Sequence, residues 1–348
     1  MKRLIKWFIL KLKNTRLRLS VFRTKPEHYK VSIFKRIKMK LKGFTPDNYH
    51  QYNFKENNPK DYLTEIDRWK TRRVNGNYNI LLDDILAFYH LFKDHVRVPK
   101  IYGWIKNRKI YDIDNGKLLS DQNLINIIKN ENKLILKPNY GGGGKGVYVI
   151  ERLNDDIIII NEEEVTIENI SNELLKLDNY TISEFINPKE VVNNIYNKTI
   201  NTIRVITIIN KEGEVEIPNA IQRFGTNESI PVDNAASGGI FSKVNILTGE
   251  LSEAKSYRTT KTFKTHPDSK KPIKGEFVGN WNNIKKEVKK VASKFPYISF
   301  MAWDIVPIDE SFYVLEINAS TAFTLIQMFE PLKHTKLANF YRQSGVIK

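Results

Sequence analysis

The amino-acid sequence predicts an α+β protein, because strand-like and helix-like hydrophobic periodicities are both present and the strands follow one another in pairs. The 348 residues are sufficient for two or three domains with buried cores. Hydrophobic residues are 41% and charged residues 27% of the chain, as in globular rather than disordered proteins. Strands joined by short connections favour antiparallel sheets over a doubly wound parallel sheet.

The first part of the chain is strongly basic. Residues 1–43 contain 15 Lys and Arg and one acidic residue. The other 305 residues contain 41 Lys and Arg and 38 acidic residues, so they are nearly neutral. In residues 2–13 the apolar side chains fall on one helical face and the lysines on the other. This pattern predicts an interfacial helix, with residues 1–20 on an anionic membrane surface. Packing of this helix on its own domain is one alternative and binding to a polyanion is another, although no motif indicates a specific nucleic acid.

The elements that follow this basic amphipathic segment, residues 1–45, are predicted in chain order. The polar, aromatic-rich residues 45–62 are expected to form a connection. Helices are expected at residues 61–73, 81–93, 168–176 and 281–295. Strands are expected at residues 98–102, 133–137, 147–150, 180–186, 203–209, 215–217, 301–306 and 312–317. The first helices and the first strand predict a small N-terminal α/β lobe over residues 46–130.

The composition excludes several kinds of chemistry. The chain contains no cysteine, which rules out disulfides, cysteine-ligated metal sites and cysteine nucleophiles. Its six histidines occur singly, and no arrangement suggests a Ser-His-Asp triad. The longest apolar runs, residues 7–10 and 157–160, are far shorter than the roughly 20 residues of a membrane-spanning helix. We therefore expect neither a transmembrane segment nor a signal peptide.

The sharpest local motif is a glycine-rich loop between two predicted strands, with Gly141–Gly144 and Gly146 in a segment that spans residues 134–150. A dinucleotide-binding loop must open a helix, but a strand follows here, and the Walker and protein-kinase motifs are missing. The remaining interpretation is a β-hairpin flap whose backbone N–H groups approach phosphate oxygens, with Lys137 and Lys145 adding positive charge. A simple flexible turn is the alternative.

The second motif is an acidic hairpin near the C-terminus. Glu316 and Asn318 are two residues apart and face the same side of one predicted strand. A turn centred near Glu310 would place Asp304 opposite Glu316. Hard oxygen ligands of this kind suit Mg²⁺, which usually keeps water and nucleotide phosphates in its remaining positions. The alternative is a solvated polar end of a strand.

In this order, the two motifs resemble the ATP-grasp superfamily, and Thr181–Ile186 is similar to the strand that contacts adenine in that superfamily. Further segments resemble its sugar-transfer associated family: residues 201–207, Arg223, residues 232–234, 238–240 and 266–267, Trp281 and residues 303–305. The resemblance covers roughly residues 45–330. It implies an ATP-grasp domain at residues 131–348, in which two α+β lobes, residues 131–186 and 187–348, clamp ATP.

The resemblance also implies roles for individual residues. Lys137 would contact the α and β phosphates, and Arg204 and Arg223 would contact the γ-phosphate or the transferred group. The ligands of one or two Mg²⁺ ions, with Mn²⁺ as an alternative, would be Asp304, Glu316 and Asn318. The nucleotide would be bound by Lys137, Gly142, Gly143, Gly144, Lys145, Glu184, Phe185 and Ile186. The substrate would be bound by Asn201, Asp233, Asn234, Gly238, Gly239 and His266. A further phosphate-contacting lysine would be Lys93, Lys100 or Lys106, which the sequence does not separate.

The activity implied by the resemblance is an ATP-dependent carboxylate–amine ligase acting in surface polysaccharide or capsule assembly. A carboxylate would attack the γ-phosphate to give an acylphosphate and ADP, and an amine would then displace phosphate. The expected substrates are a carboxylate and an amine, one of them glycan-linked, and the expected location is cytoplasmic, with peripheral attachment to the inner face of the membrane. A kinase for a glycan hydroxyl and a non-catalytic membrane-surface scaffold are the alternatives.

Overall fold

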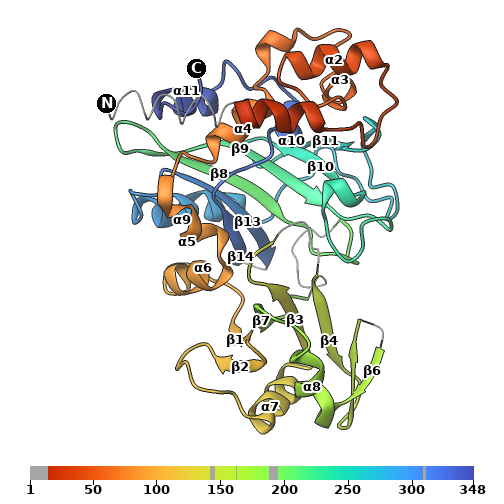
Figure 1. Ribbon diagram of the computed structural model, residues 1–348, viewed down its shortest axis with the longest axis vertical. Coiled ribbons are helices and arrows are strands. Elements are labelled where there is room, and N and C mark those ends of the chain that lie inside the picture. The colour runs from red at the N-terminus through yellow and green to blue at the C-terminus, as the bar shows by residue number, and fades with distance from the viewer. Residues whose placement is uncertain (1–14, 142–145, 162, 188–194, 309–310) are drawn as a thin grey trace.

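The computed structural model describes residues 15–141, 146–161, 163–187, 195–308 and 311–348, and these residues form two lobes (Figure 1). Each lobe contains one seven-stranded sheet. Every neighbouring pair of strands in both sheets is antiparallel, so the predicted α+β class is confirmed.

The smaller lobe is built on the sheet with strand order β2-β1-β7-β3-β4-β5-β6. Its strands are β1 (Ile101–Lys106), β2 (Lys109–Asp112), β3 (Lys133–Pro138), β4 (Tyr148–Arg152), β5 (Ile157–Ile160), β6 (Glu163–Thr166) and β7 (Tyr180–Glu184). Helices α7 (Asp121–Glu131) and α8 (Ile170–Leu174) contribute to its core, all of whose buried members lie between Ile105 and Ile182. The lobe begins and ends at one place, because the Glu184 N–H donates to the Lys100 carbonyl over 2.8 Å.

The larger lobe is built on the sheet with strand order β12-β11-β10-β9-β8-β13-β14. Its strands are β8 (Ile203–Ile209), β9 (Val215–Phe224), β10 (Ile240–Val244), β11 (Leu251–Ser256), β12 (Thr262–Phe263), β13 (Phe300–Ile308) and β14 (Ser311–Asn318). Its helices are α2 (Ile33–Leu41), α3 (Asn48–Gln51), α4 (Glu65–Thr71), α5 (Ile80–Asp83), α6 (Ile85–Phe92), α9 (Trp281–Ser293), α10 (Phe323–Gln327) and α11 (Lys336–Gln343).

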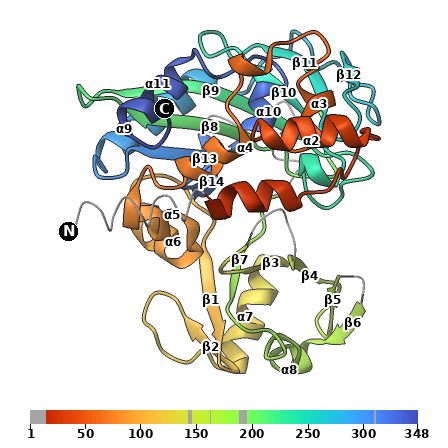
Figure 2. The same ribbon diagram turned by 45° about the horizontal axis from the view of Figure 1, so that its top comes forward.

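Helices cover both faces of the larger sheet, as the two views show (Figures 1 and 2). One face packs against α9 and the α5–α6 segment through Trp303, Ile284 and Phe92. The opposite face packs against α10, α11 and the chain before α4, and this core includes Phe300, Phe323 and Tyr341. Successive side chains of β13 therefore enter the two cores in turn and all are buried, which explains why its sequence is almost uniformly apolar.

The predicted elements recur with some differences. The strand predicted at residues 215–217 continues to Phe224, because its later residues pair with β8 and β10. Strands β10–β12 and helix α7 were not expected; their sequences are short or polar and carry little periodicity. Buried residues from Phe44 to Phe92 pack on the larger sheet, whereas residues 101–131 belong to the smaller lobe. The segment expected to form one N-terminal lobe thus contributes to both.

Candidate active site

The candidate site lies on the larger sheet, where charged residues from neighbouring strands form a row. Asp304 on β13 pairs in register with Arg204 on β8 and with Glu316 on β14. The predicted cross-strand placement of Asp304 and Glu316 is therefore confirmed, although the turn near Glu310 lies outside the described residues. Arg223 extends the row from β9, beside the start of β8.

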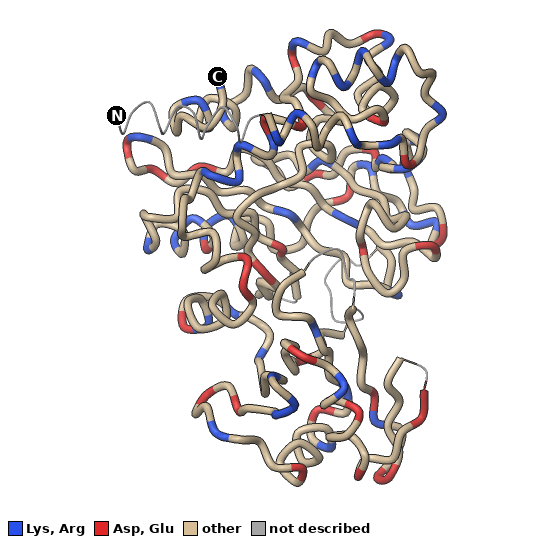
Figure 3. The backbone as a smooth tube through the Cα atoms, in the orientation of Figure 1, with Lys and Arg blue, Asp and Glu red and all other residues tan. Residues whose placement is uncertain are grey.

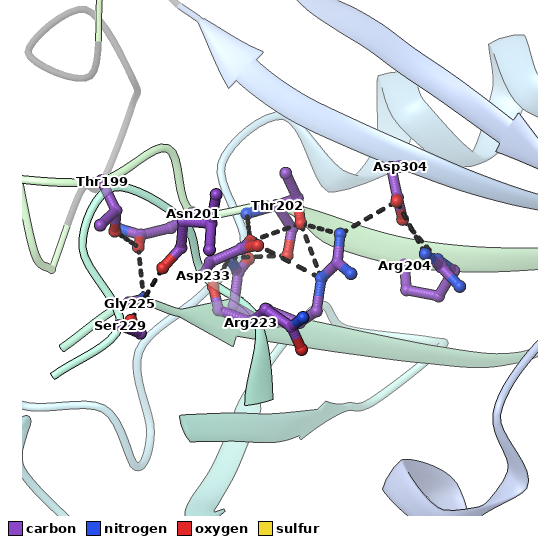
Figure 4. A network of polar contacts seen from close by, with 12 residues as sticks. Thr199, Asn201, Thr202, Arg204, Arg223, Gly225, Ser229, Asp233 and Asp304 are labelled. Carbon is purple, nitrogen blue, oxygen red and sulfur yellow. Dashed lines mark hydrogen bonds and ion pairs between the residues drawn. The ribbon is translucent and has the colours of Figure 1, made fainter. Parts of the chain in front are cut away.

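Two guanidinium groups hold Asp304 (Figure 4). Arg204 donates to both carboxylate oxygens, through Nε and, over 2.7 Å, through Nη2. Arg223 Nη2 lies 3.0 Å from Asp304 Oδ2. Burial alone would raise the pKa of Asp304, but the two arginines outweigh it and lower that pKa well below its usual value. Asp304 is therefore ionised and charge-compensated before any ligand binds.

Arg223 is positioned by a second set of polar groups. Burial lowers the pKa of Arg223, but Asp233 and Asp304 more than offset this, so the guanidinium stays charged. Its Nε donates to the Thr202 hydroxyl over 2.8 Å and lies 3.6 Å from Asp233 Oδ2. The same Asp233 oxygen accepts from the Thr202 N–H over 2.7 Å. In the sequence, nothing beyond its place in the segment 201–207 indicated Thr202.

Glu316, Asn318 and Lys137 lie beside this row. Burial, and then the like charge of Asp304, raise the pKa of Glu316. The Asn318 amide donates to Glu316 Oε1 over 3.1 Å. Lys137 comes from β3 of the smaller lobe; burial lowers its pKa, while Glu316 and Asp304 oppose that shift. The charge of a lysine on the smaller lobe thus interacts with two carboxyl groups on the larger one.

The donor set partly fits a magnesium ion. Glu316 is a carboxyl group with a raised pKa, which a bound cation would favour in its ionised form, and Asn318 adds an amide, so both have the hard-oxygen chemistry that Mg²⁺ prefers. Asp304 could join them only while sharing its oxygens with Arg204 and Arg223. Among the described residues, no group of three or more His, Cys, Asp or Glu side chains is arranged for metal binding. The predicted magnesium ligands include only two carboxylates, Asp304 and Glu316, and nucleotide phosphates would have to supply the remaining ligands.

An apolar cluster lies where the two lobes meet, formed by Ile186, Val306, Ile308 and Tyr313. The predicted residue Glu184 lies beside it: its Oε1 accepts from Tyr313 Oη over 2.5 Å and its Oε2 accepts from the Lys100 N–H over 3.0 Å. Phe185 lies under the Lys133 ammonium, 4.9 Å from the ring centre. Sequence reasoning missed Tyr313, which lies on β14 three residues before Glu316.

The three candidate lysines have different surroundings. Lys93 pairs with Asp114 at 3.1 Å, and Lys106 pairs with Asp178 at 2.7 Å. The Lys100 ammonium lies 4.8 Å from the Tyr102 ring centre, and no carboxylate of the described chain lies within ion-pair distance of it. Because Lys100 also adjoins Glu184, it is the candidate nearest the apolar cluster between the lobes.

The glycine loop joins β3 and β4, which pair in antiparallel register as expected. Gly142, Gly143, Gly144 and Lys145 lie outside the described residues. The start of the loop is anchored to the larger lobe: the Asn139 amide donates to Asp84 Oδ2 over 2.7 Å, and Asn139 Oδ1 accepts from the Leu86 N–H over 3.1 Å. Asp84 also caps α6 through the Ala87 N–H. No sequence motif predicted this anchor, because Asp84 and Asn139 are far apart in the chain.

The residues predicted to bind substrate form the layer behind Arg223. Asn201 Oδ1 accepts from the Gly225 N–H over 3.1 Å, and His266 Nε2 lies 2.7 Å from the Gly225 carbonyl. His266 is fully buried, and its Nδ1 accepts from the Asp268 and Ser269 N–H groups. Both ring nitrogens of His266 are therefore occupied by contacts with the protein backbone.

The glycine pair in this layer is tightly packed. Asn234 caps a short helix through the Ala236 N–H, and Gly238 has a φ of +116°. A Cβ on Gly239 would lie 2.7 Å from the Asp233 carbonyl oxygen and 2.9 Å from that of Phe224. The binding of substrate by this layer stays a prediction.

A pocket of about 370 Å³ opens beside Glu316 and Asn318. Its other walls come from the α4–α6 region, with Arg72 and Asp83, and from the start of the glycine loop, with Tyr140 and Gly141. Asp83 also accepts from the Ala319 N–H over 3.2 Å, which holds the end of β14 in place. The pocket therefore adjoins both predicted motifs.

Comparison with known proteins agrees with this architecture. The resemblance to ATP-grasp proteins is confirmed. The chain belongs to the sugar-transfer associated ATP-grasp family, whose sequence pattern matches residues 67–339. No curated protein matches the chain in sequence.

Several solved structures are similar to the chain. N5-carboxyaminoimidazole synthetase from Staphylococcus aureus is 11% identical, with 70% of this chain and 46% of that one covered and a TM-score of 0.38. D-Alanine–D-alanine ligase from Bacillus anthracis is 12% identical, with coverages of 76% and 63% and a TM-score of 0.36. L-Amino acid ligase from Bacillus licheniformis is 11% identical, with coverages of 76% and 47% and a TM-score of 0.39. The chain thus spans between 46% and 63% of these enzymes.

Proposed function

We propose that the two lobes bind ATP with one or two Mg²⁺ ions between their sheets. The observation that carries the proposal is the pocket that Tyr140 and Gly141, at the start of the glycine loop, line together with Glu316 and Asn318 of the larger lobe. The charge of Lys137 on β3 interacts with Glu316 and Asp304 from the same side. A buried lysine with a lowered pKa gains from a neighbouring phosphate, and Glu316 gains from a neighbouring cation. Glu316 and Asn318 would hold the Mg²⁺, whose charge would offset that of the nucleotide phosphates.

The family and the residue types support an ATP-dependent carboxylate–amine ligase. The substrate carboxylate would attack the γ-phosphate to form an acylphosphate and release ADP, and an amine would then displace phosphate. Arg204 and Arg223 present fixed positive charge to the transferring group, so no protein nucleophile is needed. We propose surface polysaccharide or capsule assembly as the setting, with one substrate glycan-linked.

The pocket beside Glu316 is the proposed entrance for the acceptor. Its walls supply cationic, anionic and hydrogen-bonding groups, through Arg72, Asp83 and Asn318, which suits a small polar substrate better than an apolar one. The predicted substrate residues around Asp233 would then act by holding Arg223 in position.

Titration with Mg²⁺ and ATP, followed by thermal unfolding, tests the nucleotide site. Ligand at about 100 times its dissociation constant should stabilise the protein by about 2.7 kcal/mol. Glu316→Gln should weaken nucleotide binding and make it respond to higher magnesium. Arg204→Ala should retain binding and lower the rate of ADP release by about 10²- to 10³-fold, because it removes charge stabilisation in the transition state. Absence of any shift in the wild-type protein would overturn the site.

The reaction itself is tested by ADP release with candidate acceptors. A requirement for both a carboxylate and an amine supports the ligase. Release with a hydroxyl acceptor alone would indicate a kinase, and nucleotide-independent function would indicate a scaffold. Mass spectrometry of surface glycan from cells with and without the gene would identify the product.

A further inference from the structure

The chain from Leu19 to Leu41 exposes an unusual share of apolar side chains. Of the fifteen large hydrophobic side chains that are exposed in the described structure, six lie within these 23 residues. They are Leu19, Phe22, Ile33, Phe34, Ile37 and Leu41. This concentration is not the scattered exposure that globular surfaces ordinarily show.

Helix α2 carries its apolar face outward. Met39 is 2% exposed and belongs to the core of the larger lobe. At 3.6 residues per turn, the face opposite Met39 carries a stripe formed by Ile33, Phe34, Ile37 and Leu41. These four side chains are 65%, 83%, 49% and 70% exposed. A helix that only covered its own core would have the reverse orientation.

A second helical segment extends this surface. Residues 15–23 are helical, with Val21 buried while Leu19 and Phe22 are exposed. The Lys40 ammonium on α2 donates to the Phe22 carbonyl over 2.6 Å, so the two helices are joined. Both helices lie toward the viewer in the orientation of Figure 2.

The surroundings of the stripe are strongly cationic. Residues 15–43 contain ten Lys and Arg and a single acid, Glu27. Lys38 on α2 and Lys42 directly after it are exposed beside the stripe, whereas Lys35 lies over the Tyr49 ring, 4.3 Å from its centre. The tube drawing shows blue segments around this part of the upper lobe (Figure 3).

We propose that α2 and residues 15–23 dock the protein on an anionic lipid surface. An apolar stripe flanked by lysines matches a bilayer interface, where acyl chains take the apolar side chains and anionic headgroups take the ammonium groups. A nucleic acid would use the charges and leave the stripe exposed to water. None of the described helices has the length and apolar character of a bilayer-spanning segment, so docking would be peripheral. Residues 1–14, for which the sequence predicts an interfacial helix, lie outside the described residues.

Vesicle flotation of the full-length protein tests this surface. The wild-type protein should float with vesicles of equimolar phosphatidylcholine and phosphatidylglycerol, but not with phosphatidylcholine alone, and binding should weaken as salt rises. Ile33→Ser/Phe34→Ser/Ile37→Ser/Leu41→Ser should weaken binding at least about tenfold, because each apolar side chain contributes on burial. Lys38→Glu/Lys42→Glu should weaken binding and reduce its dependence on salt.

The matched control is Leu118→Ser/Leu153→Ser/Leu247→Ser, which alters side chains that are 60%, 55% and 83% exposed elsewhere on the molecule. This variant should bind vesicles as the wild type does, and all variants should retain the wild-type melting temperature. Equal flotation of the stripe variant and the wild type would overturn the proposal. So would a wild-type dimer that the stripe variant converts to a monomer without any vesicle binding, or retention on nucleic acid but not on vesicles. None of these outcomes depends on nucleotide binding.

Discussion

At the scale of single residues, Asp304 is the group on which the candidate site most depends. It is buried and pairs with two guanidinium groups. Without its charge, Arg223 would keep only Asp233, 3.6 Å away, and Arg204 would lose its ion-pair partner. Asp304→Asn should therefore lower the free energy of unfolding by about 3–5 kcal/mol, as expected when one partner of a buried ion pair is removed. Arg204→Met should cost less, because Asp304 then keeps Arg223. Denaturant unfolding without nucleotide measures both, and equal losses would contradict this assignment.

His266 gives the site a specific pH response. Its pKa is lowered, chiefly by burial, so the folded protein favours neutral imidazole. The unfolded chain binds a proton as pH falls below the ordinary value of 6.5, whereas the folded protein does not. His266 therefore contributes stability above that pH, and this stability is lost as pH falls through it. Denaturation of the wild type and of His266→Gln at pH 7.5 and at about pH 5.5 should show a smaller pH dependence in the variant; an unchanged slope would contradict it.

At the scale of elements, the sequence predicted those whose side chains alternate or repeat clearly. The pairing of β13 with β14 could be predicted because its acidic residues interrupt apolar strands at fixed spacing. Strands β10–β12 could not, since their polar residues give no clear alternation of apolar side chains, although each strand pairs with the next one in the sequence. A different limit applies to the site. Asp304 and Glu316 share a motif, but the Thr202 and Tyr313 contacts arise only when separate segments meet.

The loop before β10 packs tightly against the end of β9 at Gly239. Gly239 has carbonyl oxygens of Asp233 and Phe224 where a Cβ would lie, and backbone atoms cannot rotate away. Gly239→Ala should therefore cost about 1–3 kcal/mol and displace Asp233 from Thr202. Gly103→Ala is a milder control, because its nearest contacts are 3.3 Å away. Thermal unfolding compares the stability of the two variants. An unchanged stability of Gly239→Ala would show that this loop can shift to accommodate the added Cβ.

At the scale of the whole molecule, the two lobes have separate cores. The core of the smaller lobe contains no residue of the larger sheet. Without nucleotide, calorimetry should therefore show two transitions, or one whose calorimetric enthalpy exceeds its van't Hoff enthalpy. Mg²⁺ and ATP, bound to both lobes, should merge them and raise the temperature of the first. A single two-state transition in the absence of nucleotide would contradict this independence.

The adjacent ends of the smaller lobe have a consequence for how the molecule could be taken apart. Since Lys100 and Glu184 are hydrogen-bonded neighbours, the residues between them form a domain that is inserted into the larger lobe at one point. A short turn from Lys100 to Phe185 would excise it without stretching the chain. The remaining protein would keep Arg204, Asp304 and Glu316 but lose Lys137 and the glycine loop. One deletion would thus separate the carboxylate half of the site from its glycine-loop half, so that each could be studied as a module.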